Sequence, residues 1–265
     1  MVLMLPRNPS SHKGDNGTIL VIGGSASFPG AAYLAAQSIA ALRAGADLLF
    51  IAAPEKVAWA INTFSPDLIT LKLLGSHLAP RHYRTILPYL KRADVLLLGN
   101  GIGTHPDTKR LVRKAIAASP KKLKVIDADA IKMLRLQDID HSIITPHAGE
   151  FKMLLKHSNL AAHDYRNALR HNVLLLKGKA DRIISRDAVK AVAGGSPGMT
   201  VGGTGDVLAG LCAGYLSQTK DLFRSALLAS RLSKRIGSRL QKQLGYGFVA
   251  SDFLRVIAEE GRRLR

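Results

Sequence analysis

Residues 199–210 read Met199, Thr200, Val201, Gly202, Gly203, Thr204, Gly205, Asp206, Val207, Leu208, Ala209 and Gly210. The glycines precede a predicted helix, and the free N–H groups of its first turn, together with the helix dipole, favour an anion beyond its end. Asp206 falls in that turn and could accept a proton from a hydroxyl that attacks a phosphate. A plain cap on a glycine-rich turn would need one glycine rather than three. The stretch therefore favours an anion site with an adjacent base.

The residues before this stretch alternate between short apolar runs and longer helical patterns. The runs are apolar throughout, which is typical of parallel strands that are covered on both faces. Strands are predicted at 18–22, 47–52, 94–98, 123–127, 143–145 and 173–176, and helices at about 30–44, 81–91, 107–118 and 147–155. A hairpin is predicted at 182–185 and 188–192, and the rest is predicted to be helical. The pattern indicates an α/β fold, a doubly wound and mostly parallel sheet with helices on both faces.

Composition sets the class of protein. The 265 residues, 47% hydrophobic and 22% charged, suit one globular domain over residues 1–265, and no repeat or linker divides it. Apolar runs are too short to cross a bilayer, and Pro6 and Arg7 interrupt the start before a secretion signal could form. The single cysteine, Cys212, lies in an apolar helical stripe, which predicts a buried packing residue. These features fit a soluble protein of a reducing cytoplasm.

A formal net charge of +19 makes nucleic acid a partner to consider. The basic residues gather at Lys121, Lys122 and Lys124, at Arg231, Lys234, Arg235, Arg239 and Lys242, and at Arg262, Arg263 and Arg265. Aromatic residues are not interleaved with them, and no reading helix is recognisable. We therefore expect solvated faces, which would also attract anionic ligands such as nucleotides.

Ligands of open α/β sheets bind beyond the carboxyl ends of the strands, so functional residues are expected in the loops that follow the strands. The loop after 18–22 holds Gly23, Gly24, Ser25, Pro29, Gly30 and Ala31, whose small size lets a ligand approach the backbone. The loop Gly99-Asn100-Gly101-Ile102-Gly103 is not a dinucleotide fingerprint, because Thr104 or Pro106 stands where the third glycine is needed. It predicts a flexible floor for a flat ligand.

Two further loops carry polar groups. After 123–127, Asp129 is expected to cap a helix, and Asp127 is either structural or in contact with a metal or substrate through water. The other loop reads Thr145-Pro146-His147-Ala148-Gly149-Glu150. His147 and Glu150 are three residues apart at a helix start, which suits helix capping by Glu150 and leaves a ligand contact by His147 as the alternative.

The motif Gly202-Gly203-Thr204-Gly205-Asp206 is similar to the anion hole and catalytic aspartate of ribokinase-like kinases. Its neighbours narrow the resemblance to the ADP- or ATP-dependent NAD(P)H-hydrate dehydratase family, over about residues 13–258 and in the family's motif order. They are Gly30-Ala31, Asp127-Ala128-Asp129-Ala130, Thr145-Pro146-His147 with Glu150, Lys177-Gly178 and the approach Gly198-Met199-Thr200-Val201.

The resemblance implies a metabolite-repair lyase that dehydrates the hydrated forms (S epimer) of NADH and NADPH. Asp206 would deprotonate the ring hydroxyl, and Gly203, Thr204 and Gly205 would stabilise the transferring phosphoryl group. The hydrated cofactor would contact Ala31, Gly101, His147 and Asp206, and the nucleotide would contact Lys177, Gly178, Lys179, Ala180, Asp181 and Gly205. ADP, or else ATP, would be the co-substrate. Mg²⁺ would bridge the phosphates, with Glu150 as its protein contact, directly or through water. Homo-oligomers are common in the family.

The chain also departs from the family's pattern. Lys179, Ala180 and Asp181 follow the Lys-Gly pair where a threonine or serine is common, which affects the adenine contacts. Asn100 stands where proline is usual, which should loosen that loop slightly. About 15 residues precede the first predicted strand. No fused epimerase domain is therefore expected, and any epimerase should be a separate protein.

Two other functions compete with this interpretation. A vitamin or sugar kinase of the same fold would use the same anion hole and Asp206, but the Thr145-Pro146-His147 segment and the apolar stretch 25–32 argue against it. A basic nucleic-acid-binding protein rests on charge alone. Its binding would survive Asp206→Ala and would weaken steeply with salt.

Overall fold

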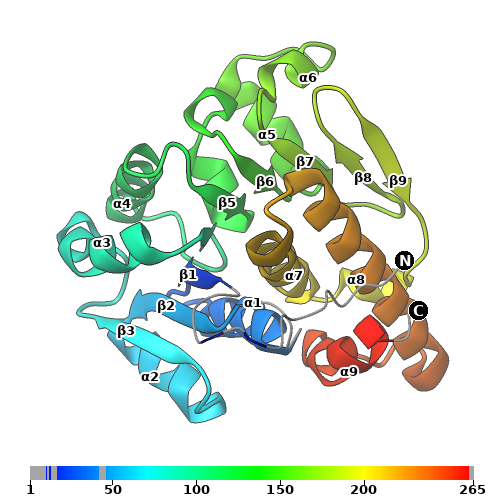
Figure 1. Ribbon diagram of the computed structural model, residues 1–265, viewed down its shortest axis with the longest axis horizontal. Helices are drawn as coiled ribbons and strands as arrows, with labels where there is room; N and C mark the ends of the chain where they lie inside the picture. The colour runs from blue at the N-terminus through cyan, green and yellow to red at the C-terminus, as the bar shows by residue number, and fades with distance from the viewer. Residues whose placement is uncertain (1–9, 11, 13–16, 42–45, 263–265) are drawn as a thin grey trace.

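The computed structural model describes residues 10, 12, 17–41 and 46–262, and Figure 1 shows their arrangement. One nine-stranded sheet has the order β3-β2-β1-β4-β5-β6-β7-β8-β9. Its strands are β1 (Thr18–Ile22), β2 (Leu48–Pro54), β3 (Ile69–Leu73), β4 (Val95–Leu98), β5 (Leu123–Ile126), β6 (Ser142–Ile144), β7 (Val173–Leu176), β8 (Asp181–Ile184) and β9 (Val189–Val192). The pairings from β3 to β7 are parallel, and β8 and β9 add an antiparallel hairpin.

Nine α-helices are assigned in the described residues. They are α1 (Pro29–Ala41), α2 (Glu55–Phe64), α3 (Tyr83–Arg92), α4 (Pro106–Ala117), α5 (Ala148–Ser158), α6 (Tyr165–Ala168), α7 (Thr204–Thr219), α8 (Leu222–Leu244) and α9 (Ala250–Arg262). Short 3-10 turns occur at Pro80–His82, Ala128–Met133, Leu136–Asp138 and Pro197–Thr200. The last part of the first predicted helix, residues 42–44, lies outside the described residues.

Helices cover both faces of the sheet, as predicted. Alternate residues of a strand point to opposite faces. Ile19 and Val21 of β1 pack with α1, α2, α7, α8 and α9, whereas Leu20 and Ile22 pack with α3, α4 and α5. The carboxyl ends of the parallel strands therefore open between two helical layers, and that edge is where the loops named above converge.

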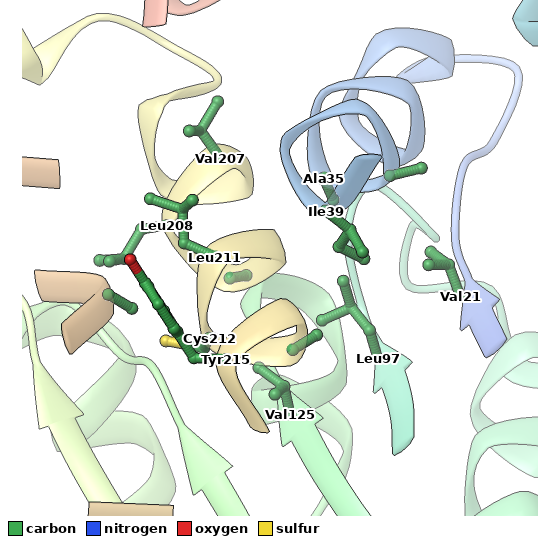
Figure 2. Close-up of a cluster of buried hydrophobic side chains, with 14 of the residues drawn as sticks. Val21, Ala35, Ile39, Leu97, Val125, Val207, Leu208, Leu211, Cys212 and Tyr215 are labelled. Atoms are coloured by element: carbon green, nitrogen blue, oxygen red, sulfur yellow. The ribbon is translucent and has the colours of Figure 1, made fainter. Parts of the chain in front are cut away.

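Helix α7 is the central helix of one layer. Figure 2 shows apolar side chains of α7 in one cluster with side chains of α1 and of three strands. The labelled residues of α7 are Val207, Leu208, Leu211, Cys212 and Tyr215, and the others are Ala35 and Ile39 of α1, Val21 of β1, Leu97 of β4 and Val125 of β5. Cys212 is fully buried, which confirms the packing prediction. Helix α7 approaches α1 closely at Gly210, where a Cβ atom would overlap the hydroxyl of Ser38 and the carbonyl oxygen of Ala35.

This close crossing predicts the result of a small substitution. Gly210→Ala should lower the free energy of unfolding by about 2–4 kcal/mol, because the methyl group meets backbone that cannot move aside without separating the helices. Urea unfolding measures the change. Gly30→Ala, in α1, is the matched control, because a Cβ there has no neighbour within 4 Å. An equal effect of both substitutions would contradict the close-packing explanation.

The expectation of solvated basic faces was wrong for several residues. Lys124 is fully buried, and its ammonium group donates to three backbone carbonyl groups. Lys234 is also buried. Arg235 and Arg239 of α8 form ion pairs with Glu260 of α9, so part of the second cluster holds helices together. The partners of Lys124 are carbonyl groups of the neighbouring turn, whereas those of Lys234, Arg235 and Arg239 lie far along the chain.

Three elements were missed in the sequence: α2, β3 and the short helix α6. Helix α2 buries Val57, Ala58 and Ile61, and β3 pairs with β2 at the edge of the sheet. Arg263 and Arg265 of the third basic cluster lie outside the described residues. Among the helices that the structure describes, none is long and apolar enough to cross a membrane.

Candidate active site

The start of α7 has the geometry that the glycine-rich stretch predicts. Gly203 precedes the helix with φ of 95°, and a Cβ there would lie 2.5 Å from Cδ1 of Leu34, so glycine is required. The Thr204 hydroxyl donates to the carbonyl oxygens of Met199 (2.7 Å) and Val201 (3.1 Å). The hydroxyl is thus committed to the loop, and the backbone N–H groups of the first turn are left for an anion.

The ammonium group of Lys177 lies beside this helix start. A Cβ on Gly205 would be 3.4 Å from Nζ of Lys177. Nζ is 3.1 Å from Oδ1 of Asp127 and 3.9 Å from Oε2 of Glu150. Burial by itself lowers the pKa of Lys177, but the two carboxylates outweigh it and raise that pKa. A fixed positive charge therefore stands next to the predicted anion site.

Asp206, in the first turn of α7, is the candidate base. Burial and the negative charge of Asp127 raise the pKa of Asp206 to about 7, although the Asn100 hydrogen bond and Lys177 oppose the shift. A carboxylate with a pKa near neutrality both accepts and releases a proton readily. Its environment is therefore suited to general base catalysis.

Asp127 and Asn100 join Asp206 to Lys177. Asp127 is almost fully buried and accepts hydrogen bonds from Nδ2 of Asn100 (2.9 Å), Oγ1 of Thr145 (2.6 Å) and Nζ of Lys177 (3.1 Å). These three donors favour the structural alternative for Asp127. Asn100 also donates to Oδ1 of Asp206 at 2.7 Å. The fully buried Asn100 side chain thus ties its loop in place, in contrast to the loosening expected from the sequence.

Asp129 does not cap a helix, which corrects the prediction. Its Oδ2 accepts the N–H of Gly103 at 2.9 Å, and its Oδ1 lies 2.7 Å from Nζ of Lys132. The loop after β4 is therefore fastened at Asn100 and again at Gly103. The parallel pairing of β4 with β5 brings the loops that follow these two strands side by side, and a prediction of that pairing would have indicated the contact.

His147 and Glu150 form a capping box at the start of α5. Nδ1 of His147 accepts the N–H groups of Gly149 (3.0 Å) and Glu150 (3.3 Å), and Oε2 of Glu150 accepts the His147 N–H at 3.0 Å. Both residues therefore cap the helix, and the prediction that Glu150 is a helix cap is confirmed. The His147 side chain remains 61% exposed. Its contact with a ligand stays a prediction.

The loop after β7 is held from α8. Asp181 is buried and accepts hydrogen bonds from the Gly178 N–H (3.0 Å) and the Ser230 hydroxyl (2.8 Å). Lys234 donates to the carbonyl oxygen of Gly178 at 2.6 Å and lies 3.2 Å from Oδ1 of Asp181. The buried carboxylate of Asp181 therefore fixes the conformation of the loop through these contacts. Lys179 and Ala180 are exposed at the tip of the loop. The contact of Lys234 with this loop was not predicted, because in the sequence Lys234 is one of several basic residues in the same segment.

The two residues expected on the nicotinamide side come together. A Cβ on Gly101, whose φ is 65°, would lie 2.7 Å from Cβ of Ala31 and 2.8 Å from the carbonyl oxygen of Phe28. The loop after β1 also meets the loop after β4, since the Gly24 N–H donates to the Asn100 carbonyl oxygen at 2.8 Å. Ala31, Gly101, Asp206 and Lys177 are thus linked through contacts at one edge of the sheet.

The chain has the fold of a solved ribokinase-like superfamily protein of Enterococcus faecalis, with which it aligns at a TM-score of 0.86 and 21% identity over 98% of this chain and 92% of that chain. A family model described as NAD(P)H-hydrate dehydratase matches residues 19–259. The chain belongs to this family, as the resemblance of its motifs implied.

Known relatives agree with this assignment. The chain is 38% identical over 271 residues to the bifunctional NAD(P)H-hydrate repair enzyme of Methanothermobacter thermautotrophicus, covering 97% of this chain and 52% of the relative. It therefore spans about half the length of that relative. It is 34% identical over 259 residues to the ADP-dependent (S)-NAD(P)H-hydrate dehydratase of Nitrosopumilus maritimus, covering 94% of this chain and 89% of the relative.

A solved structure shares the fold. The ADP/ATP-dependent NAD(P)H-hydrate dehydratase of Bacillus subtilis, co-crystallised with ATP and Mg²⁺, aligns with a TM-score of 0.74 over 97% of this chain and 94% of that chain, at 23% identity. At 23% identity, this alignment shows a shared fold and nothing further.

Proposed function

We propose that the protein dehydrates the hydrated forms of NADH and NADPH at the expense of a nucleoside diphosphate or triphosphate. The observation that carries the proposal is the Asp206 carboxylate, with a pKa of about 7, in the first turn of a glycine-lined helix whose start also faces Lys177. A base, unpaired N–H groups and a cation are the parts that phosphoryl transfer to a hydroxyl requires. The family and the named dehydratase of Nitrosopumilus maritimus support the choice of substrate.

The proposed reaction has two steps. Asp206 takes the proton of the ring hydroxyl while the hydroxyl oxygen attacks the terminal phosphorus of the nucleotide, which leaves one phosphate shorter. The phosphorylated ring then loses a proton from the neighbouring carbon to water and expels inorganic phosphate, so that the electron pair of the broken C–H bond forms the ring double bond. The hydroxyl oxygen leaves within the phosphate. N–H groups of Thr204, Gly205 and Asp206 stabilise the charge on the transferring group, and Lys177 neutralises the nucleotide phosphates.

We also propose that Mg²⁺ binds with the nucleotide. Magnesium is commonly held by one or two carboxylates together with substrate phosphates. Glu150 would be the protein contact of Mg²⁺, directly or through water, because its buried carboxylate lies at the same edge of the sheet as Lys177. The ion would supply charge neutralisation on the phosphates. Binding of the nucleotide to the loop Lys177–Asp181 and to Gly205, and of the hydrated cofactor to Ala31, Gly101 and His147, is part of the proposal.

The remaining proposals concern the setting of the reaction. We propose a homo-oligomer, supported by exposed apolar side chains at Trp59, Phe64 and Ile69 on the packed pair α2 and β3. A cytoplasmic location is supported by the single, buried cysteine. An epimerase for the hydrated cofactors is the proposed functional partner, supported by the bifunctional relatives.

The decisive test measures recovery of the reduced cofactor. In a mixture of purified protein, Mg²⁺ and hydrated NADH, the absorbance of the reduced nicotinamide should return when ADP or ATP is added, and only then. Comparison of the two nucleotides identifies the donor, which we expect to be ADP. Folded protein that gives no recovery with either nucleotide would contradict the proposal. Detection of a stable phosphorylated product would favour a small-molecule kinase instead.

A further inference from the structure

Asn100 occupies an unusual position between two acidic side chains. It follows β4, is fully buried, and its Nδ2 donates to Oδ2 of Asp127 at 2.9 Å and to Oδ1 of Asp206 at 2.7 Å. Both hydrogens of the carboxamide are therefore used, each on a different carboxylate. The two acceptors come from separate parts of the chain, the end of β5 and the start of α7.

The contacts of Asn100 set the environment of Asp206. Asp127 holds Lys177 and Thr145 through its Oδ1, while its Oδ2 takes the Asn100 hydrogen bond. A neutral amide thus separates two acidic groups that would otherwise repel each other, and it links Asp206 to the cation through Asp127. The charges that act on Asp206 are those of Asp127, Lys177 and Asp129.

We infer that Asn100 is a positioning residue for Asp206. Its carboxamide fixes Oδ1 and thereby turns Oδ2, the second carboxylate oxygen, toward the substrate hydroxyl. An aspartate side chain has several allowed torsions, so a buried donor that binds one carboxylate oxygen selects one orientation of the group. This inference rests on the proposed function for its kinetic consequence, although the hydrogen-bond geometry stands without it.

The kinetic test compares two buried asparagines. Asn172 is also buried and makes two hydrogen bonds, but it lies beside the amino ends of β6 and β7, on the opposite edge of the sheet. Asn100→Leu should lower kcat about 30-fold and leave KM for hydrated NADH within about twofold. Asn172→Leu should leave both constants within about twofold of the wild-type values, although it also loses buried hydrogen bonds. Equal kinetic losses in the two variants would overturn the inference.

A second measurement does not depend on turnover. Titration of carboxyl carbons by NMR, with the Asp206 signal assigned from its absence in Asp206→Asn, should give a higher pKa for Asp206 in Asn100→Leu than in the wild type, because the hydrogen bond from Asn100 stabilises the ionised form. Asn172→Leu should leave it unchanged. An unchanged pKa in Asn100→Leu would overturn the inference even if the wild-type protein fails to dehydrate the cofactors. That failure alone would count against the proposed function only.

Asn100→Ala serves in both measurements if the leucine variant does not fold. The smaller side chain removes both donated hydrogen bonds and introduces no new bulk between the carboxylates. The same decrease in kcat and the same increase in the pKa of Asp206 are expected. A wild-type titration curve in folded Asn100→Ala would contradict the inference.

Discussion

Replacing Asp206 with asparagine is expected to abolish most of the activity and at the same time to stabilise the fold at alkaline pH. Loss of the base should lower kcat by about 10³-fold. The pKa of Asp206 is raised in the fold from 3.8 to about 7, first by burial and then by the charge of Asp127. Because one pKa unit corresponds to about 1.4 kcal/mol, the variant should gain on the order of 2–4 kcal/mol at pH 8.

The sign of this effect depends on pH. A carboxyl whose pKa is raised by folding favours the folded state while it is protonated, and that contribution is lost as the pH rises through about 7. The gain in Asp206→Asn should therefore shrink below pH 7 and vanish near pH 4. Urea unfolding at both pH values measures it, and an equal gain at both would point to packing instead. For the same reason, kcat of the wild type should fall as the pH drops through about 7.

Removing the charge of Lys177 is expected to damage both stability and turnover. Lys177→Met leaves Asp127 and Glu150 without their buried cation, and breaking such a pair costs about 3–5 kcal/mol. The pKa of Lys177 is raised in the fold, so its contribution is fully present at neutral pH and is lost only above the ordinary lysine range. We also expect kcat to fall at least about 10²-fold, because the charge beside the anion site is gone.

The matched control for this prediction is Lys220→Met. Lys220 lies 3.6 Å from Asp94 in a pair whose side chains are 50% and 43% exposed. Such surface pairs contribute at most about 1 kcal/mol. Thermal and urea unfolding of both variants, together with the dehydration assay, separate the two cases. A similarly small loss of stability in both variants would show that the ion pairs of Lys177 contribute no more than a surface pair does.

The sheet was largely predictable because its central strands are continuous apolar runs. The bounds of β1 and β7 agree with the predicted 18–22 and 173–176. Strand β8 lies one residue before the predicted 182–185, and β9 begins one residue after the start of the predicted 188–192. The edge strand β3 was missed because one of its faces carries polar side chains, although that face packs against α2. Its Thr70 and Lys72 share a face and bond to Asn62 of α2, so the run alternates and does not read as a buried strand.

The candidate site was predictable where its signal is local. The glycines before α7 reveal a helix start, because the backbone conformation at Gly203 depends on few neighbours. Contacts between distant segments were not predictable. Asn100 and Asp206 are 106 residues apart, and their hydrogen bond depends on how α7 packs against β4. Lys124 gave no signal either, because its partners are backbone carbonyl groups.

The order of the site residues along the chain bears on how the protein is made. Asn100, Asp127 and Thr145 precede Lys177, and Asp206 comes last. A ribosome releases the chain from its amino terminus, so β5 and β6 emerge before the lysine that neutralises Asp127 is available. Enclosing that carboxylate without its cation is costly. We therefore expect the nascent sheet to remain open to water at the carboxyl ends of β5 and β6 until β7 has been synthesised.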